Sequence, residues 1–202
     1  KITNGPSEAR NFALKFVKTD LVAFCDIDDL WNSKKLEKQI KFHTTKNLDL
    51  SVTSYSKFRD KDIKPINFII RPPKVITYKK MLRENYIPML TVIIKKEYIK
   101  DGFPLVEHED YALWLNLFKN KRNFRAESLN ENLAYYRIHN NNLTKSKIKM
   151  IFWVLRVFKY HGLKGINLYI NLFLWILLKA FRTLFQNKIF YNIVNFFESN
   201  RK

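Results

Sequence analysis

Cysteines, acidic residues and long apolar runs are all scarce in this sequence of 202 residues. Cys25 is the only cysteine, which excludes an internal disulfide and a cysteine-based zinc site and is compatible with a reducing cytosol. The longest apolar run, 168–178, is interrupted by Asn171 and is shorter than the about 20 residues that a bilayer-spanning helix needs. These absences exclude a disulfide-stabilised scaffold and argue against a transmembrane helix.

The shortage of acids leaves the chain strongly basic. Lysine and arginine number 37 against 18 aspartates and glutamates, which gives a formal net charge of +19. Such an imbalance indicates an anionic partner, namely a nucleic acid, a phospholipid surface or a phosphorylated substrate. The alternative is compositional bias, because a chain rich in Lys, Asn and Ile is typical of a low-GC genome.

The hydrophobic pattern predicts an α/β domain over the first part of the chain. Hydrophobic residues make up 47% of the sequence, which is enough for a folded core. We expect strands at 19–27, 48–58, 65–74, 88–96 and 131–139, and helices after Asn32 or Ser33, at 77–85 and at 109–121, with a helical turn at 96–104 that ends at Gly102. This alternation predicts a sheet with helices, and the apolar run at 19–27 favours a mostly parallel one.

The composition changes near residue 140. From 145 to 202, aromatic and aliphatic residues are interleaved with lysine and arginine. We therefore predict two parts, a domain at 1–144 and a helical, basic and aromatic region at 145–202. The second part fits amphipathic helices that lie in a membrane interface, and the alternative is a helical hairpin that packs against the sheet domain.

Three aspartates, Asp26, Asp28 and Asp29, occupy four positions directly after the predicted strand at 19–27. Ligands of open α/β sheets bind at the carboxyl ends of strands, and neighbouring carboxylates raise one another's pKa unless a cation compensates. Oxygen ligands without cysteine favour Mg²⁺ or Mn²⁺. The alternative is an acid-rich turn that caps the following helix.

Three blocks of sequence together resemble the family 2 glycosyltransferases of bacteria, which have the glycosyltransferase A-type fold. The first is Asn-Gly-x-Ser-x-Ala-Arg-Asn at 4–11 followed by Asp-x-Asp-Asp-x-Trp at 26–31; the second is "HEDYALWLNLFK" at 108–119; the third is "NENLAYYRIHNNNLT" at 130–144. They occur in the family's order and with similar spacing. The resemblance implies a partial A-type, Rossmann-like mixed sheet.

The resemblance also implies roles for residues in the first block. Asp26 and Asp28 match the D-x-D acids, with Asp28 the direct metal ligand and Asp26 near the ribose or the metal. Asp29 would support them or cap the next helix. Arg10 matches an arginine that approaches the nucleotide, and Asn11 would hold its loop. The alternative for Arg10 is an ordinary surface charge.

The second and third blocks carry the other implied site residues. Asp110 matches the catalytic base, and Glu109 is its neighbour; the alternative for both is an acid at a helix start. His139 lies where related enzymes place a polar group near the diphosphate, and the alternative is a structural histidine. Trp31 and Trp114 fit the core better than a sugar-stacking platform.

The resemblance implies an inverting, metal-dependent transfer of a sugar from a nucleotide-sugar donor to a saccharide or lipid-linked acceptor. The ion, Mn²⁺ or Mg²⁺, neutralises the leaving diphosphate, and a carboxylate takes the proton of the acceptor hydroxyl. We expect a role in bacterial envelope polysaccharide synthesis, at the cytoplasmic face of the plasma membrane and peripheral to it, with no nucleic-acid partner.

The first residue, Lys1, is not methionine, and family members carry further strands upstream. We therefore expect the chain to be a fragment that is not a self-sufficient transferase. Three alternatives remain: a non-catalytic membrane-associated remnant, a nucleic-acid-binding module suggested by charge alone, and a glycosidase with two carboxylates.

Overall fold

A mixed seven-stranded sheet forms the centre of the computed structural model, which describes residues 5–59, 66–138 and 147–181. Five strands lie in the order β1-β6-β3-β7-β2, while β4 pairs with β3 and β5 with β7. Their bounds are β1 Leu21–Ala23, β2 Leu30–Trp31, β3 Leu50–Phe58, β4 Ile66–Ile70, β5 Val75–Ile76, β6 Ile93–Lys95 and β7 Ala126–Arg137. The predicted α/β class with a mixed sheet is confirmed.

The pairing corrects one expectation. Among the described residues, β3 and β7 are the one parallel pair, running from Leu50 opposite Ala126 to Phe58 opposite Arg137. β1 pairs antiparallel with β6, so the acidic turn does not follow a parallel strand. An apolar run of this length indicated burial but not strand direction, because the direction depends on which distant segment supplies the partner.

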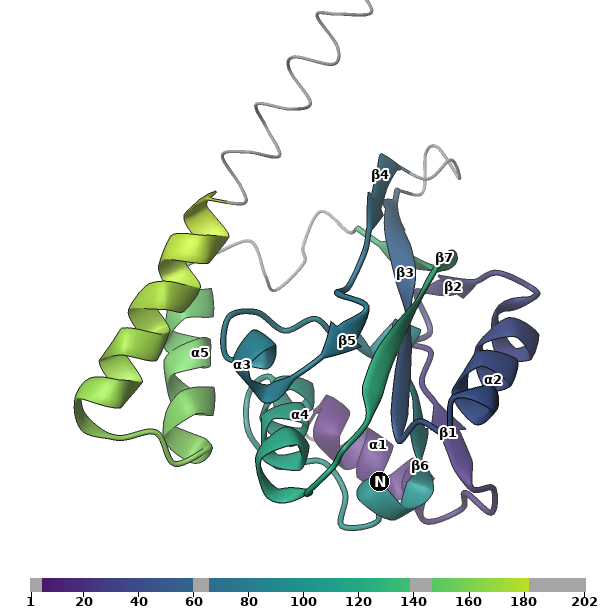
Figure 1. Cartoon of the computed structure of the whole chain (residues 1–202), viewed down its shortest axis with the longest axis horizontal. Helices are drawn as coiled ribbons and strands as arrows, with labels where there is room; N and C mark the ends of the chain where they lie inside the picture. The colour runs from purple at the N-terminus through teal and green to yellow at the C-terminus, as the bar shows by residue number, and fades with distance from the viewer. Residues whose placement is uncertain (1–4, 60–65, 139–146, 182–202) are drawn as a thin grey trace, which may run out of the picture.

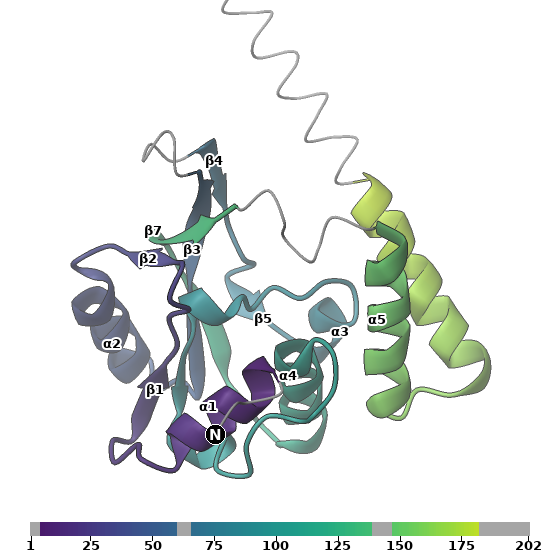
Figure 2. The same cartoon turned by 180° about the vertical axis from the view of Figure 1, so that it is seen from behind.

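Helices cover both sides of the sheet (Figures 1 and 2). Helix α2 (Lys35–Thr45) lies on one side; α3 (Tyr78–Met81), α4 (Glu109–Asn120) and α5 (Lys147–Tyr160) lie on the other. The remaining elements are α1 (Pro6–Leu14), the short 3₁₀ turns η1 (Met89–Thr91) and η2 (Lys96–Tyr98), and a helix at 165–181. α5 and the helix at 165–181 lie side by side as a hairpin (Figure 1).

Helix α2 contacts the sheet through polar side chains rather than through its apolar ones. Leu36 and Ile40 are exposed, whereas Lys35, Gln39 and His43 are buried. Gln39 donates hydrogen bonds to backbone oxygens of β3 and η1, and Lys35 Nζ donates to Gln39 Oε1 at 2.8 Å. Burial lowers the pKa of Lys35 to about 8. These internal bonds are what make a polar helix face stable inside the protein.

The hydrophobic core runs without a break from the sheet into the hairpin. Val52 of β3, Tyr111 and Leu115 of α4, and Phe158 and Trp175 of the hairpin belong to one cluster of buried side chains. The hairpin therefore packs on α3 and α4. This is the arrangement that the sequence analysis gave as the alternative to helices in a membrane interface. The division into parts at 1–144 and 145–202 stays a prediction.

Candidate active site

Arg10 connects two acidic segments that are far apart in the sequence. Its Nη2 lies 3.1 Å from Asp26 Oδ1, in the turn after β1, and its Nη1 donates to Glu109 Oε1 at the start of α4. Arg10 and Glu109 are both largely buried, while the Asp26 side chain is 48% exposed. The structure thus brings three of the predicted site residues, Arg10, Asp26 and Glu109, into contact.

Asn11 fixes the helix that carries Arg10. Its amide accepts a hydrogen bond from Phe103 N at 2.6 Å and donates one to Phe103 O at 2.9 Å. Gly102 has φ +82°, and a Cβ on it would lie 2.6 Å from Asn11 Oδ1. A glycine is therefore needed at 102 both for the backbone conformation and for the approach of Asn11.

The three aspartates of the turn after β1 do not share one role. Asp29 is buried and accepts a hydrogen bond from Arg137 N at 3.0 Å, and burial together with the neighbouring acids raises its pKa to about 6. Arg137 Nε donates to the backbone oxygen of Asp28 at 2.5 Å. Asp29 and Arg137 thus hold the turn against the end of β7, while the Asp26 carboxylate is open to solvent.

Arg137 is a residue that the sequence reasoning missed. It lies in the third motif block, and its guanidinium also stacks over Phe58, with 4.6 Å from Cζ to the ring centroid. The motif could have pointed to Arg137, because this arginine is one of the residues of the third block. What the sequence lacked was the pairing of β2 with β7, which brings Arg137 next to the acidic turn.

Glu109 and Asp110 begin α4. His108 before them has φ 56°, a left-handed conformation that turns the chain into the helix. Asp110 Oδ1 accepts from Tyr111 N at 2.6 Å, and Oδ2 accepts from Asn85 Nδ2 at 3.2 Å. Burial, and next the charge of Glu109, raise the pKa of Asp110. Asn85 is a second residue that the sequence gave no reason to select.

The described residues contain no cluster of three acidic, histidine or cysteine side chains that would hold a metal ion by themselves. Mg²⁺ takes one or two carboxylates and completes its shell with water and substrate phosphates, so a two-carboxylate site is sufficient for it. Asp26 is exposed and Asp28 is half-buried two residues later, and both offer hard oxygen donors. The donor set therefore fits Mg²⁺ or Mn²⁺ shared with a diphosphate.

The hairpin contacts the residues that lead into α4. The rings of Trp153 and His108 meet edge to face with centroids 4.9 Å apart, and Arg156 pairs with Glu107. Neither contact was visible in the sequence, because the hairpin's position depends on its packing against α4.

The remaining predicted residues lie as follows. His139 is outside the described residues, so its role stays a prediction. Trp114 is completely buried, and its Nε1 donates to Ile87 O. Trp31 is partly buried, donates to Leu90 O at 2.7 Å, and lies under the ammonium of Lys35. Both tryptophans therefore have structural partners.

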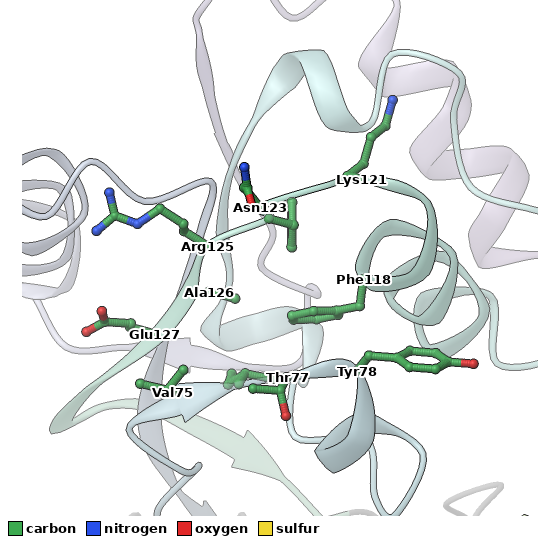
Figure 3. Close-up of a pocket in the computed structure, with 11 residues that line it drawn as sticks. Val75, Thr77, Tyr78, Phe118, Lys121, Asn123, Arg125, Ala126 and Glu127 are labelled. Carbon is green, nitrogen blue, oxygen red and sulfur yellow. The ribbon is translucent and has the colours of Figure 1, made fainter.

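A separate cavity of about 340 Å³ lies at the other end of α4, between β5 and the start of β7. In Figure 3 the ring of Phe118 extends into it, while the charged ends of Lys121 and Arg125 point away. Nine residues of α-helix separate Phe118 from Glu109, which corresponds to about 14 Å. None of the predicted site residues lines this cavity, so it is not part of the candidate site.

The chain is similar to known proteins in sequence. Residues 1–92 match the family described as Glycosyl transferase family 2. The chain is 35% identical over 170 residues to UDP-Glc:alpha-D-GlcNAc-diphosphoundecaprenol beta-1,3-glucosyltransferase WfaP of Escherichia coli, covering 84% of the chain and 66% of that protein.

Two solved structures have a similar fold. The crystal structure of S. aureus TarS 1–349 in complex with UDP-GlcNAc superposes with a TM-score of 0.59 at 17% identity, over 85% of this chain and 52% of that one. The mannosyltransferase PcManGT from Pyrobaculum calidifontis, in complex with GDP-Man and Mn²⁺, gives 0.55 at 15% identity, over 85% and 50%. At these identities the likeness shows the fold alone.

The sheet and the matched sequences define a glycosyltransferase A-type protein. The chain belongs to glycosyl transferase family 2. It spans just under two thirds of WfaP and about half of the two solved structures.

Proposed function

We propose that this protein transfers a sugar, with inversion, from a nucleotide-sugar donor to a saccharide or lipid-linked acceptor in envelope polysaccharide synthesis. The observation that carries the proposal is Arg10, which joins the acidic turn of the D-x-D motif to the Glu109–Asp110 pair. Sugar transfer requires the donor's diphosphate and the acceptor's hydroxyl to be bound in one site. We assign the acidic turn to the diphosphate and the Glu109–Asp110 segment to the hydroxyl.

The acidic turn would serve the leaving group. Asp26 and Asp28 would hold Mg²⁺ or Mn²⁺, which when bound neutralises the charge that develops on the nucleoside diphosphate. Arg10 already faces Asp26, so its guanidinium would be available to the same phosphates once one of its two carboxylate contacts is exchanged. Asp29 and Arg137 keep the turn in place.

Asp110 would serve the nucleophile. A carboxylate with a raised pKa is a stronger base at neutral pH than an ordinary aspartate, and burial and Glu109 both act in this direction on Asp110. Asn85 and the Tyr111 amide hold the carboxylate in one orientation. A single base and a one-step displacement lead to inversion at the anomeric carbon.

The setting of the reaction is part of the proposal. WfaP is named for an acceptor with a diphosphoundecaprenol group, which is a membrane lipid. By analogy, we place the present protein at the inner face of the plasma membrane, peripheral to it, with a lipid-linked acceptor held at the surface.

A binding experiment tests the proposal without knowledge of the donor sugar. Mn²⁺ is titrated into the protein in the absence of nucleotide, with UDP and with GDP, for the wild type, Asp28→Ala and the exposed control Asp101→Ala. We expect one diphosphate to tighten Mn²⁺ binding. In Asp28→Ala the diphosphate should no longer tighten Mn²⁺ binding. The loss of Mn²⁺ affinity should exceed the roughly 10- to 100-fold that removal of a residue that only supports a metal ligand costs.

The control variant Asp101→Ala should behave as the wild type. If neither diphosphate changes Mn²⁺ binding to the wild type, the proposal fails and the non-catalytic remnant is favoured. A wild type that binds Mn²⁺ and UDP together with no loss in Asp28→Ala would instead remove Asp28 from the site.

A further inference from the structure

The helix at 165–181 is apolar on two opposite faces. Its inner face buries Leu168 and Trp175 against the rest of the protein. Its outer face exposes five large apolar side chains at positions i, i+3, i+4, i+7 and i+11, which is the spacing of one continuous helical stripe. These outer-face residues are Ile166 (79% exposed), Tyr169 (65%), Ile170 (50%), Phe173 (63%) and Leu177 (51%).

The outer face is held outward by polar contacts on the inner face. Arg83 Nη1 donates to Asn171 Oδ1 at 2.8 Å, and Asn171 is buried. Lys179 Nζ lies 3.8 Å from Glu84 Oε1. Because α3 and the residues after it fix the helix from within, its rotation about its own axis would break both contacts, and the stripe stays on the surface.

Helix α5, which lies beside this helix, also exposes large apolar side chains. Ile148 and Phe152, one helical turn apart, are 69% and 58% exposed. Lys159 is exposed further along the same side of α5, at i+11 from Ile148. Aromatic and aliphatic side chains beside lysine are typical of helices that lie in a membrane interface.

Within residues 147–181 the formal charges have one sign, although Arg156 and Lys179 pair with Glu107 and Glu84 outside this range. Residues 147–181 include six lysines and arginines and no acidic residue, and the sequence has no aspartate or glutamate from 132 to 197. A second copy of this chain would bring the same cations to the interface and be repelled. An anionic lipid surface is complementary to it, because it attracts each basic residue near the surface.

We propose that the outer face of the helix at 165–181, with the exposed side of α5, docks flat on an anionic lipid bilayer. Seventeen helical residues are about 25 Å long, and lying in the interface buries the stripe along its whole length. The hairpin also contacts Glu107 and His108, which precede Glu109 and Asp110. Docking would bring the start of α4 near the lipid surface; this last step rests on the proposed function.

The test is co-sedimentation of the whole chain with vesicles of phosphatidylglycerol and phosphatidylcholine, and with vesicles of phosphatidylcholine alone, at low and high salt. We expect binding to the anionic vesicles that weakens with salt. Phe173→Ser should reduce the partition coefficient between vesicles and water about tenfold, because burial of a phenylalanine side chain in an apolar phase changes an equilibrium constant by about that factor. The matched control is Phe16→Ser, which removes a phenylalanine that is 67% exposed outside the hairpin.

Both substitutions replace exposed side chains, so circular dichroism and the melting temperature should match the wild type. Equal loss in both variants, or no loss in Phe173→Ser, overturns the proposal. So does a wild-type dimer that Phe173→Ser converts to monomer without any vesicle binding, which would assign the face to a second copy. The assay needs neither donor nor metal, so its failure is distinguishable from failure of the proposed transfer reaction.

Discussion

Arg10 and Glu109 are 99 positions apart in the chain and form the contact on which the site's geometry depends. Both side chains are largely buried, so the pair is a different case from a surface ion pair, which contributes little. The arginine also reaches Asp26. Its removal leaves a buried carboxylate without its cationic partner.

We therefore expect Arg10→Gln to lower the free energy of unfolding by about 1–3 kcal/mol, the usual cost of a buried group that loses its partner. Urea unfolding followed by circular dichroism measures this. Arg122→Gln, at an exposed arginine, is the control and should change the midpoint little. An Arg10→Gln midpoint equal to that of the control would mean that the pair contributes nothing to stability.

At the scale of elements, His161 fastens the hairpin to the sheet domain. Its Nε2 lies 2.8 Å from Tyr78 Oη of α3, and its Nδ1 lies 2.8 Å from Asn116 Oδ1 of α4. A neutral ring satisfies both contacts, by donating to the amide oxygen and accepting from the phenol. Burial, and next the charge of Lys119, lower the pKa of His161 to about 4.

This pKa predicts a pH dependence of stability. Between the ordinary value of 6.5 and about 4, the unfolded chain binds a proton that the folded chain does not, so stability falls as the pH is lowered through this window. Unfolding free energies measured from pH 7 to pH 4 should fall less steeply in His161→Gln. His43 acts in the same direction and Asp29, with its pKa raised to about 6, acts in the opposite one. Both are present in the wild type and in His161→Gln, so the difference between the two curves isolates His161. Parallel curves would show that His161 does not titrate in this way.

Elements with a strong local pattern were predicted well. The helix expected at 109–121 is α4 at Glu109–Asn120, since its apolar residues repeat at helical spacing and acids begin it. The strand expected at 19–27 is only Leu21–Ala23, and the strand expected at 131–139 begins five residues earlier, at Ala126. Pairing partners decide strand ends, and β7 begins where parallel pairing with β3 begins.

At the scale of the whole molecule, the buried cluster that joins the hairpin to α4 predicts one cooperative unfolding transition. Trp31 and Trp114 lie in the α/β part, and Trp153 and Trp175 lie in the hairpin. Variants that keep only one of these pairs report on each part by fluorescence. In each variant we expect fluorescence and circular dichroism to give the same denaturant midpoint. An earlier transition from the hairpin pair would show that the hairpin opens independently.

The sequence by itself determined the family, the α/β class and which motif residues are candidates for the site, because motifs and hydrophobic periodicity are local properties. Tertiary structure alone decided which acids meet Arg10, how Arg137 and Asn85 support them, and that α2 buries Lys35 and Gln39 while Leu36 stays exposed. Each of these depends on contacts between segments far apart in the chain. Such contacts are set by strand pairing and core packing, and no local pattern encodes them.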